Sequence, residues 1–183
     1  AGMREMLVEQ QDVFYYVTLM NENYANPDLP EGAAEGVLRG GYHFGSYGPT
    51  EGPRVTLLGS GAIFTEVVQA AQKLAEQGIG ANVYSITSWS ELARDGMAHE
   101  SDGDIPYLAQ LLSSSSGPIV AATDYVRAVP ESVRAYVPAG RTYRTLGTDG
   151  FGRSDTRAVL RSFFNVDAES ILARALVELG VNE

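Results

Sequence analysis

The chain has 183 residues, of which 44% are hydrophobic and 20% are charged, and it contains no Cys. That composition supports a globular core and excludes disordered, collagen-like and disulfide-scaffold proteins. Lys and Arg number 13 against 23 Asp and Glu, so the net charge is −10. A field of that sign repels phosphate groups, so we expect neither nucleic acid nor an acidic membrane as a partner.

The N-terminus and the hydropathy of the chain bear on localisation. No stretch approaches the roughly 18 consecutive apolar residues that cross a bilayer. The first ten residues carry Arg4, Glu5 and Glu9 instead of the apolar centre of a signal peptide. We therefore expect a cytoplasmic protein.

Residues 12–20 (DVFYYVTLM) are β-branched, aromatic and almost free of charge. Such a run predicts a strand that is buried on both faces. Residues 21–36 are rich in Pro, Gly and acidic side chains, which is typical of a connector. A strand buried on both faces needs neighbours on both sides, and the adjacent sequence supplies none. The predicted core therefore begins after residue 36.

From residue 37 onward, short apolar runs alternate with amphipathic segments. The predicted strands cover residues 40–44, 55–58, 82–86, 118–122 and 143–146. The predicted helices cover residues 62–77, 90–97, 105–112, 130–136, 155–164 and 168–179. Strands that alternate with helices favour an α/β fold in three layers, with helices on both faces of a largely parallel sheet.

In open α/β sheets, ligands and catalytic groups gather beyond the carboxyl ends of the strands. The candidate site residues in three of these loops are Ser60, Ser88, Glu91 and Asp124. The loop at residues 59–62 lies between a strand and a helix, but Phe64 stands where a dinucleotide fingerprint has its third Gly. Two interpretations stay open for it: a tight strand-to-helix turn, and a weak phosphate cradle at the helix N-terminus.

The fourth loop, residues 147–155, is the densest in polar groups. Its candidate interface residues are Asp149, Phe151, Gly152, Arg153, Ser154 and Asp155. Asp149 pairs with Arg153 across the turn in one interpretation, Arg153 binds an anion in another, and Ser154 is placed to cap the next helix. Contact with another domain or subunit, local structure and ligand binding are the three roles we consider for this loop.

The sequence offers no self-sufficient active site. His43 and His99 are its only histidines, and the acidic stretch of His99, Glu100, Asp102 and Asp104 lacks ordered metal-ligand spacing. We expect that stretch to be a solvated loop. A hydrolase is disfavoured because the G-x-S-x-G nucleophile elbow does not occur.

Five strings distributed along the chain resemble one known family. They are FYYVTLMNENY (14–24), LPEGAAEG (29–36), TSWSELARDG (87–96), TDY (123–125) and LGTDGFGRSD (146–155). They are similar to the C-terminal region of the homodimeric, bacterial-type pyruvate dehydrogenase component, a transketolase-like thiamine diphosphate enzyme. The similarity runs from about Asp12 to the end of the chain.

The resemblance implies a division of the chain and a direction for one strand. Residues 1–36 are then the tail of a preceding pyrimidine-binding domain with a linker, and residues 37–183 a transketolase C-terminal-like α/β domain. The sheet is then mixed and five-stranded, with the strand at residues 40–44 antiparallel at an edge.

The resemblance also implies a function for the parent enzyme. That enzyme is an oxidoreductase of pyruvate metabolism, which decarboxylates pyruvate oxidatively and transfers the acetyl group to lipoamide. Its cofactors are thiamine diphosphate and Mg²⁺, and its partners are a second copy of itself and the lipoyl acyltransferase. The G-D-G…N-N segment that holds the cofactor is absent from this chain. We therefore expect no bound cofactor, no catalytic residue and no activity here, but a role in dimer assembly and structural support. The alternative is a stand-alone α/β module that binds a small anion at the carboxyl edge of its sheet.

Overall fold

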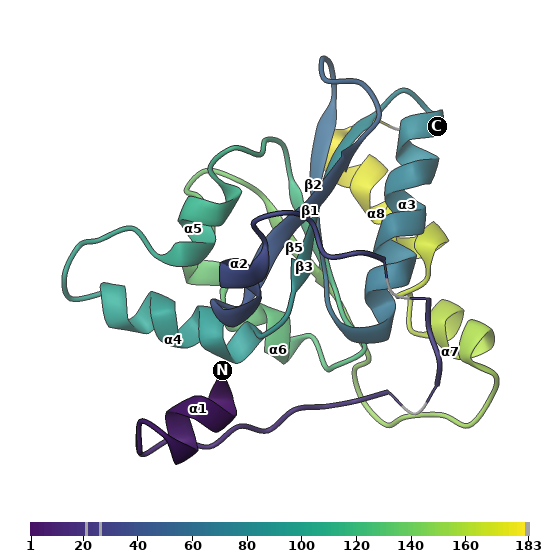
Figure 1. The fold of residues 1–183 in the computed structure, drawn as a ribbon. Coiled ribbons are helices and arrows are strands. Elements are labelled where there is room, and N and C mark those ends of the chain that lie inside the picture. Colours follow the sequence, from purple (N-terminus) through teal and green to yellow (C-terminus); the bar gives the residue numbers. More distant parts are fainter. Residues whose placement is uncertain (21, 26, 182–183) are drawn as a thin grey trace.

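A five-stranded mixed sheet forms the centre of the protein (Figure 1). The computed structural model describes residues 1–20, 22–25 and 27–181. The strands are β1 (Gly41–Tyr47), β2 (Arg54–Gly59), β3 (Gly80–Ile86), β4 (Ile119–Ala122) and β5 (Tyr143–Leu146). Their order is β1-β3-β2-β4-β5; β1 runs antiparallel to β3, and the other pairs are parallel. The α/β fold with one antiparallel edge strand is thus confirmed.

Helices cover both faces of the sheet and divide the core into two clusters (Figure 1). One face carries α3 (Phe64–Glu76), preceded by the 3-10 turn η1 (Gly61–Ile63), and α8 (Ala168–Leu179). The other carries α4 (Trp89–His99), α5 (Tyr107–Leu112), α6 (Ala128–Glu131) and the 3-10 turn η2 (Arg134–Tyr136). The helix α7 (Arg157–Phe163) precedes α8, and it contains no buried residue.

The two longest helices show how the sequence pattern determines the packing. In α3, Val67, Ala70, Ala71 and Leu74 are spaced to lie on one face, and all four are buried. The helix α8 begins at Asp167, whose carboxylate accepts a hydrogen bond from the backbone N–H of Ser170. Its apolar face packs on α3 and against the sheet.

The predicted boundaries differ from the observed ones where local signals conflict. The predicted helix at residues 130–136 is two short pieces, α6 and η2, and α5 begins two residues later than predicted, after Pro106. The strand β1 continues to Tyr47, into the predicted turn, because it pairs with β3 as far as Ala81. The predicted connector at residues 21–36 ends in the helix α2 (Ala34–Leu38), and its positions 21 and 26 lie outside the described residues.

The predicted buried strand at residues 12–20 is wrong for this chain. These residues form no strand, and their large side chains are exposed, with Phe14 and Tyr16 at 88%. The physical reason is the absence of a neighbouring strand to hydrogen bond with them, since an isolated extended segment has no ladder. The segment follows the short helix α1 (Gly2–Leu7) and lies outside the sheet (Figure 1).

This N-terminal segment crosses the carboxyl edge of the sheet and is held there by polar contacts. The hydroxyl groups of Thr18 and Tyr125 lie 2.7 Å apart. The Tyr24 hydroxyl accepts a hydrogen bond of 3.0 Å from Arg161 of α7, and Glu22 forms an ion pair with Arg157. These contacts involve exposed or half-buried groups and bury little apolar surface. Within the described residues, no helix is long and apolar enough to cross a membrane.

Candidate functional site

The carboxyl edge of the sheet contains a topological switch point between β2 and β4. The helix after β2 packs on one face, and the helix after β4 packs on the other. In doubly wound sheets such a position is where a ligand crevice opens. Here Ser60 follows β2, and Thr123 follows β4.

A buried hydrogen-bond network closes this switch point. The Ser60 hydroxyl donates to the Thr123 hydroxyl at 2.8 Å and accepts a hydrogen bond from the Trp89 indole N–H at 3.0 Å. All three residues are buried. The Thr123 hydroxyl oxygen also accepts a hydrogen bond of 3.3 Å from the backbone N–H of Tyr125. The network therefore joins the carboxyl ends of β2 and β4 to the start of α4.

Replacing Ser60 by alanine is expected to destabilise the protein by about 1–3 kcal/mol, because the Trp89 indole N–H is then buried without an acceptor. The measurement is urea unfolding followed by Trp fluorescence. Ser154→Ala, at an exposed position, is the matched control and should change the free energy of unfolding by no more than about 0.5 kcal/mol. Equal effects of the two variants would show that the network contributes nothing to stability.

Asp124 lies beside the loop 59–62, at the start of η1. Its carboxylate is beside Gly61, the first residue of η1; a Cβ on that Gly would be 3.2 Å from Asp124 Oδ1. Oδ1 is buried and has no hydrogen-bond partner among the described residues. The N-terminal end of a helix attracts negative charge, and a carboxylate is already present there. This arrangement disfavours a phosphate cradle at the loop 59–62.

The loop after β3 starts the helix α4. The Ser88 hydroxyl accepts a hydrogen bond of 3.1 Å from the backbone N–H of Glu91 and caps the helix. The Glu91 carboxylate forms an ion pair with Arg94 one turn later. Both predicted site residues therefore have local structural partners.

The loop at residues 147–155 is attached to the neighbouring loop by Asp149. The Asp149 carboxylate accepts hydrogen bonds from the backbone N–H of Arg127, at 2.9 Å, and from its guanidinium group. These bonds, the backbone one first, lower the pKa of Asp149. The predicted pairing of Asp149 with Arg153 is wrong: the Arg153 guanidinium lies 5.4 Å from the centre of the Phe163 ring.

The tip of this loop projects into solvent. Phe151 is 94% exposed, and Gly152 and Ser154 beside it are exposed as well. Ser154 does not cap the next helix, because α7 begins at Arg157 with Thr156 as its N-cap residue. The Asp155 carboxylate instead accepts a hydrogen bond of 2.7 Å from the backbone N–H of Thr156.

The two histidines have structural neighbours. The His43 ring packs against the Tyr84 ring at a tilt of 60°, with ring centroids 5.1 Å apart, and His99 Nδ1 lies 2.7 Å from the backbone carbonyl oxygen of Asp95. Throughout residues 1–20, 22–25 and 27–181, no group of three or more His, Cys, Asp or Glu side chains is arranged to hold a metal ion.

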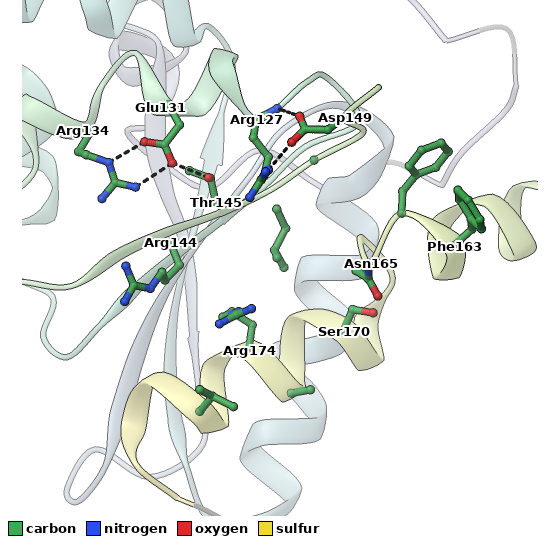
Figure 2. A pocket seen from close by; sticks show the side chains of 15 residues that line it. Arg127, Glu131, Arg134, Arg144, Thr145, Asp149, Phe163, Asn165, Ser170 and Arg174 are labelled. Atoms are coloured by element: carbon green, nitrogen blue, oxygen red, sulfur yellow. Dashed lines mark hydrogen bonds and ion pairs between the residues drawn. The ribbon is translucent and has the colours of Figure 1, made fainter. Parts of the chain in front are cut away.

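Sequence reasoning missed a groove of about 830 Å³ beside β5 (Figure 2). It lies between β5, α8 and the segment that joins α7 to α8, and Arg127 and Asp149 border it. Its other charged residues are Glu131, Arg134, Arg144 and Arg174. These residues are scattered over nearly 50 positions of the sequence, so no local pattern signals the groove.

The mixed five-stranded sheet and the loops at its carboxyl edge define an α/β domain of the transketolase C-terminal type. The family model described as "Transketolase-like TK C-terminal domain" matches residues 40–167, and the chain belongs to that family. Solved transketolases share the fold: those from Leishmania mexicana and Campylobacter jejuni both give a TM-score of 0.55 at 20% identity. The match covers 82% of this chain and 20% of the first, and 77% of this chain and 19% of the second.

Among characterised sequences, the chain is similar to proteins named pyruvate dehydrogenase E1 component. The one from Escherichia coli K12 is 47% identical over 188 residues, and the one from Pseudomonas aeruginosa is 46% identical over 187 residues. The match covers 97% of this chain in both cases but only 21% of each relative. The chain thus spans about a fifth of the length of these relatives, and the resemblance seen in the sequence strings is confirmed.

Proposed function

We propose that this chain is the C-terminal domain of a pyruvate dehydrogenase E1 component. The parent enzyme then uses thiamine diphosphate and Mg²⁺ to decarboxylate pyruvate in the cytoplasm and passes the acetyl group to the lipoyl acyltransferase. The observation that carries the proposal is the 46–47% identity to such components over 97% of the chain. The solved transketolases support the fold alone, because their identity to this chain is 20%.

The residues of this chain do not fit the cofactor, so we assign it no catalytic step. The Asp124 carboxylate, beside the first residue of η1, would repel a diphosphate there, and the Ser60 hydroxyl donates its hydrogen bond to the Thr123 hydroxyl. The described residues also contain no cluster of ligands for Mg²⁺. The chemistry would belong to the cofactor and to other domains, and this domain would serve dimer assembly and support its neighbour.

The isolated 183-residue chain is expected neither to bind thiamine diphosphate nor to turn over pyruvate. The reason is the missing G-D-G…N-N segment together with the misfit at the carboxyl edge. Isothermal titration calorimetry with thiamine diphosphate and Mg²⁺ measures binding, and the full native gene product is the positive control. That product should carry the G-D-G…N-N segment and show thiamine-dependent acetyl transfer from pyruvate to lipoamide. Saturable micromolar binding by the chain alone, or an inactive native product, would contradict the proposal.

We also propose that residues 1–36 belong with a preceding pyrimidine-binding domain and residues 37–183 with the C-terminal domain. The support is the difference in burial: residues 12–20 are exposed, whereas the sheet residues from β2 to β4 are almost all buried. In the parent enzyme the apolar side chains of residues 12–20 would be covered by that neighbouring domain. In the isolated chain they are open to other molecules.

Deleting residues 1–30 is expected to leave the rest folded and to reduce self-association of the isolated chain. Exposed apolar segments recruit partners, and Phe14, Tyr16 and Leu19 are each more than 80% exposed. Sedimentation velocity measures self-association, and circular dichroism measures the melting temperature. A matched variant with Phe14, Tyr16 and Leu19 all changed to Ser should reproduce the loss of self-association. A deletion variant that fails to fold would overturn the division of the chain.

A further inference from the structure

The groove beside β5 reverses the charge that the rest of the protein carries. The sequence has a net charge of −10 and 13 basic residues, yet four of those, Arg127, Arg134, Arg144 and Arg174, line this single groove (Figure 2). Only two carboxylates, those of Glu131 and Asp149, line it with them. The adjoining Glu178 carboxylate pairs with both Arg144 and Arg174, so the four arginines face three carboxylates and the groove carries a surplus of one positive charge.

The four arginines are held in place by carboxylates that do not exhaust their donors. Arg144 donates through Nε to Glu178 at 2.9 Å, and Arg174 lies 3.4 Å from the same oxygen. The Glu178 side chain is only 9% exposed, so one nearly buried carboxylate fixes two guanidinium groups. Each group keeps terminal N–H donors in the fork geometry that suits carboxylates. The side chains of Arg144 and Arg174 are about half exposed.

The groove also has an apolar wall. Phe163 and Val177 line it, and both are more than half exposed although they are large apolar residues. Exposed apolar groups beside arginines are typical of protein interfaces, in which an anchor residue is surrounded by charged contacts. An enclosed small-molecule pocket would instead bury most of its polar groups.

We propose that this groove binds an acidic segment of a partner protein, one that carries apolar side chains between its carboxylates. The carboxylates pair with Arg144 and Arg174, and an apolar side chain packs against Phe163 and Val177. A surplus positive charge in an otherwise acidic surface attracts such a segment here and repels it elsewhere. This inference is independent of the proposed enzymatic function, since it rests on residues of this chain alone.

The test uses a fluorescein-labelled peptide of twelve residues in which every fourth position is Leu and the others are Glu. Fluorescence anisotropy with the 183-residue chain at 50 mM NaCl should give saturable binding in the micromolar range. Raising NaCl to 200 mM should weaken binding at least threefold, because exposed charges are screened. The Arg144→Ala, Arg174→Ala double variant should weaken binding at least tenfold.

Matched variants separate the groove from general charge effects. The double variant Arg4→Ala, Arg94→Ala removes two exposed arginines outside the groove, each likewise paired with a Glu, and should change the dissociation constant less than twofold. In the Arg144→Ala, Arg174→Ala variant, the Glu178 carboxylate has lost both of its arginines. Adding Glu178→Gln removes this unpaired charge and should make the variant more stable, and peptide binding should stay weak. Circular dichroism melts confirm that each variant is folded.

Three results would overturn the proposal. One is no saturable binding at 50 mM NaCl. Another is an equal loss of binding in the groove variant and in the Arg4, Arg94 control. The third is displacement of the peptide by citrate at a lower concentration than by unlabelled peptide, which would make the groove a site for small anions.

Discussion

Replacing Gly117 by alanine is expected to lower the free energy of unfolding by about 2–5 kcal/mol. Gly117 has a φ of +75°, a conformation that costs about 1–2 kcal/mol for a residue with a Cβ. The new Cβ would also lie 1.8 Å from the backbone carbonyl oxygen of Arg54, so a strand must shift, which adds about 1–3 kcal/mol. Thermal melts should show a fall in the melting temperature of roughly 4–20 °C for a domain of this size.

Gly140 provides the control for this prediction. Its φ of +78° is nearly the same, but a Cβ there would meet nothing within 4 Å. Gly140→Ala should therefore lower the free energy of unfolding only by the penalty for a Cβ at positive φ, about 1–2 kcal/mol. If Gly117→Ala and Gly140→Ala lower the free energy of unfolding equally, the close approach of Gly117 to Arg54 does not constrain the start of β4.

The loop at residues 113–117, four serines and Gly117, is held in place by residues that are distant in the sequence. The Arg141 guanidinium donates to the carbonyl groups of Gly117, at 2.7 Å, and Ser116, at 3.0 Å. It also donates to the Thr56 hydroxyl at 2.6 Å. One side chain thus ties the loop before β4 to the start of β2. No periodicity or turn rule relates residues 56, 117 and 141, so the arrangement could not be predicted from the sequence.

The strands could be predicted because a strand that is buried on both faces is a short run of apolar residues in the sequence. The runs around Leu57, Val83 and Val120 are apolar since both faces of the sheet are covered, and each is buried. At residues 12–20 the apolar run is equally clear, but these residues lie outside the sheet and their large side chains are exposed. An apolar run indicates that a segment can be buried, but it does not indicate which residues would cover it.

The candidate site was predictable only as far as neighbouring residues determine it. The cap at Ser88 follows from local spacing, whereas the partner of Asp149 is Arg127, 22 residues away. The groove beside β5 depends on how α8 packs, since that packing brings Arg174 to Arg144 through Glu178. Long-range pairs of this kind require the three-dimensional arrangement.

The exposure of Phe151 leads to the second large expected effect. In the full-length enzyme, Phe151→Ala is expected to weaken dimerisation by about 2 kcal/mol or more, which is roughly a thirtyfold rise in the dissociation constant. A large aromatic side chain that is 94% exposed on a loop anchored by Asp149 and Arg127 is suited to fill a pocket on another subunit. We expect Arg153→Ala to act in the same direction, because its exposed guanidinium, which lies over the Phe163 ring, has N–H donors that could bond across such a contact. Activity would fall with dimerisation if the cofactor lies between subunits.

The isolated chain separates an interface role from a structural one. Because Phe151 makes almost no contact within the domain, Phe151→Ala should shift the melting temperature of the 183-residue chain by no more than about 2–4 °C, which corresponds to ~1 kcal/mol. Met97→Ala, at an exposed apolar position on α4, is the matched control and should leave dimerisation of the full-length enzyme unchanged. Analytical ultracentrifugation of the full-length variants and melts of the chain measure the two effects. Unchanged dimerisation together with a strongly destabilised chain would mean that residues 147–155 serve the local structure of the domain, since a side chain that contacts a partner subunit stabilises the assembly and not the isolated fold.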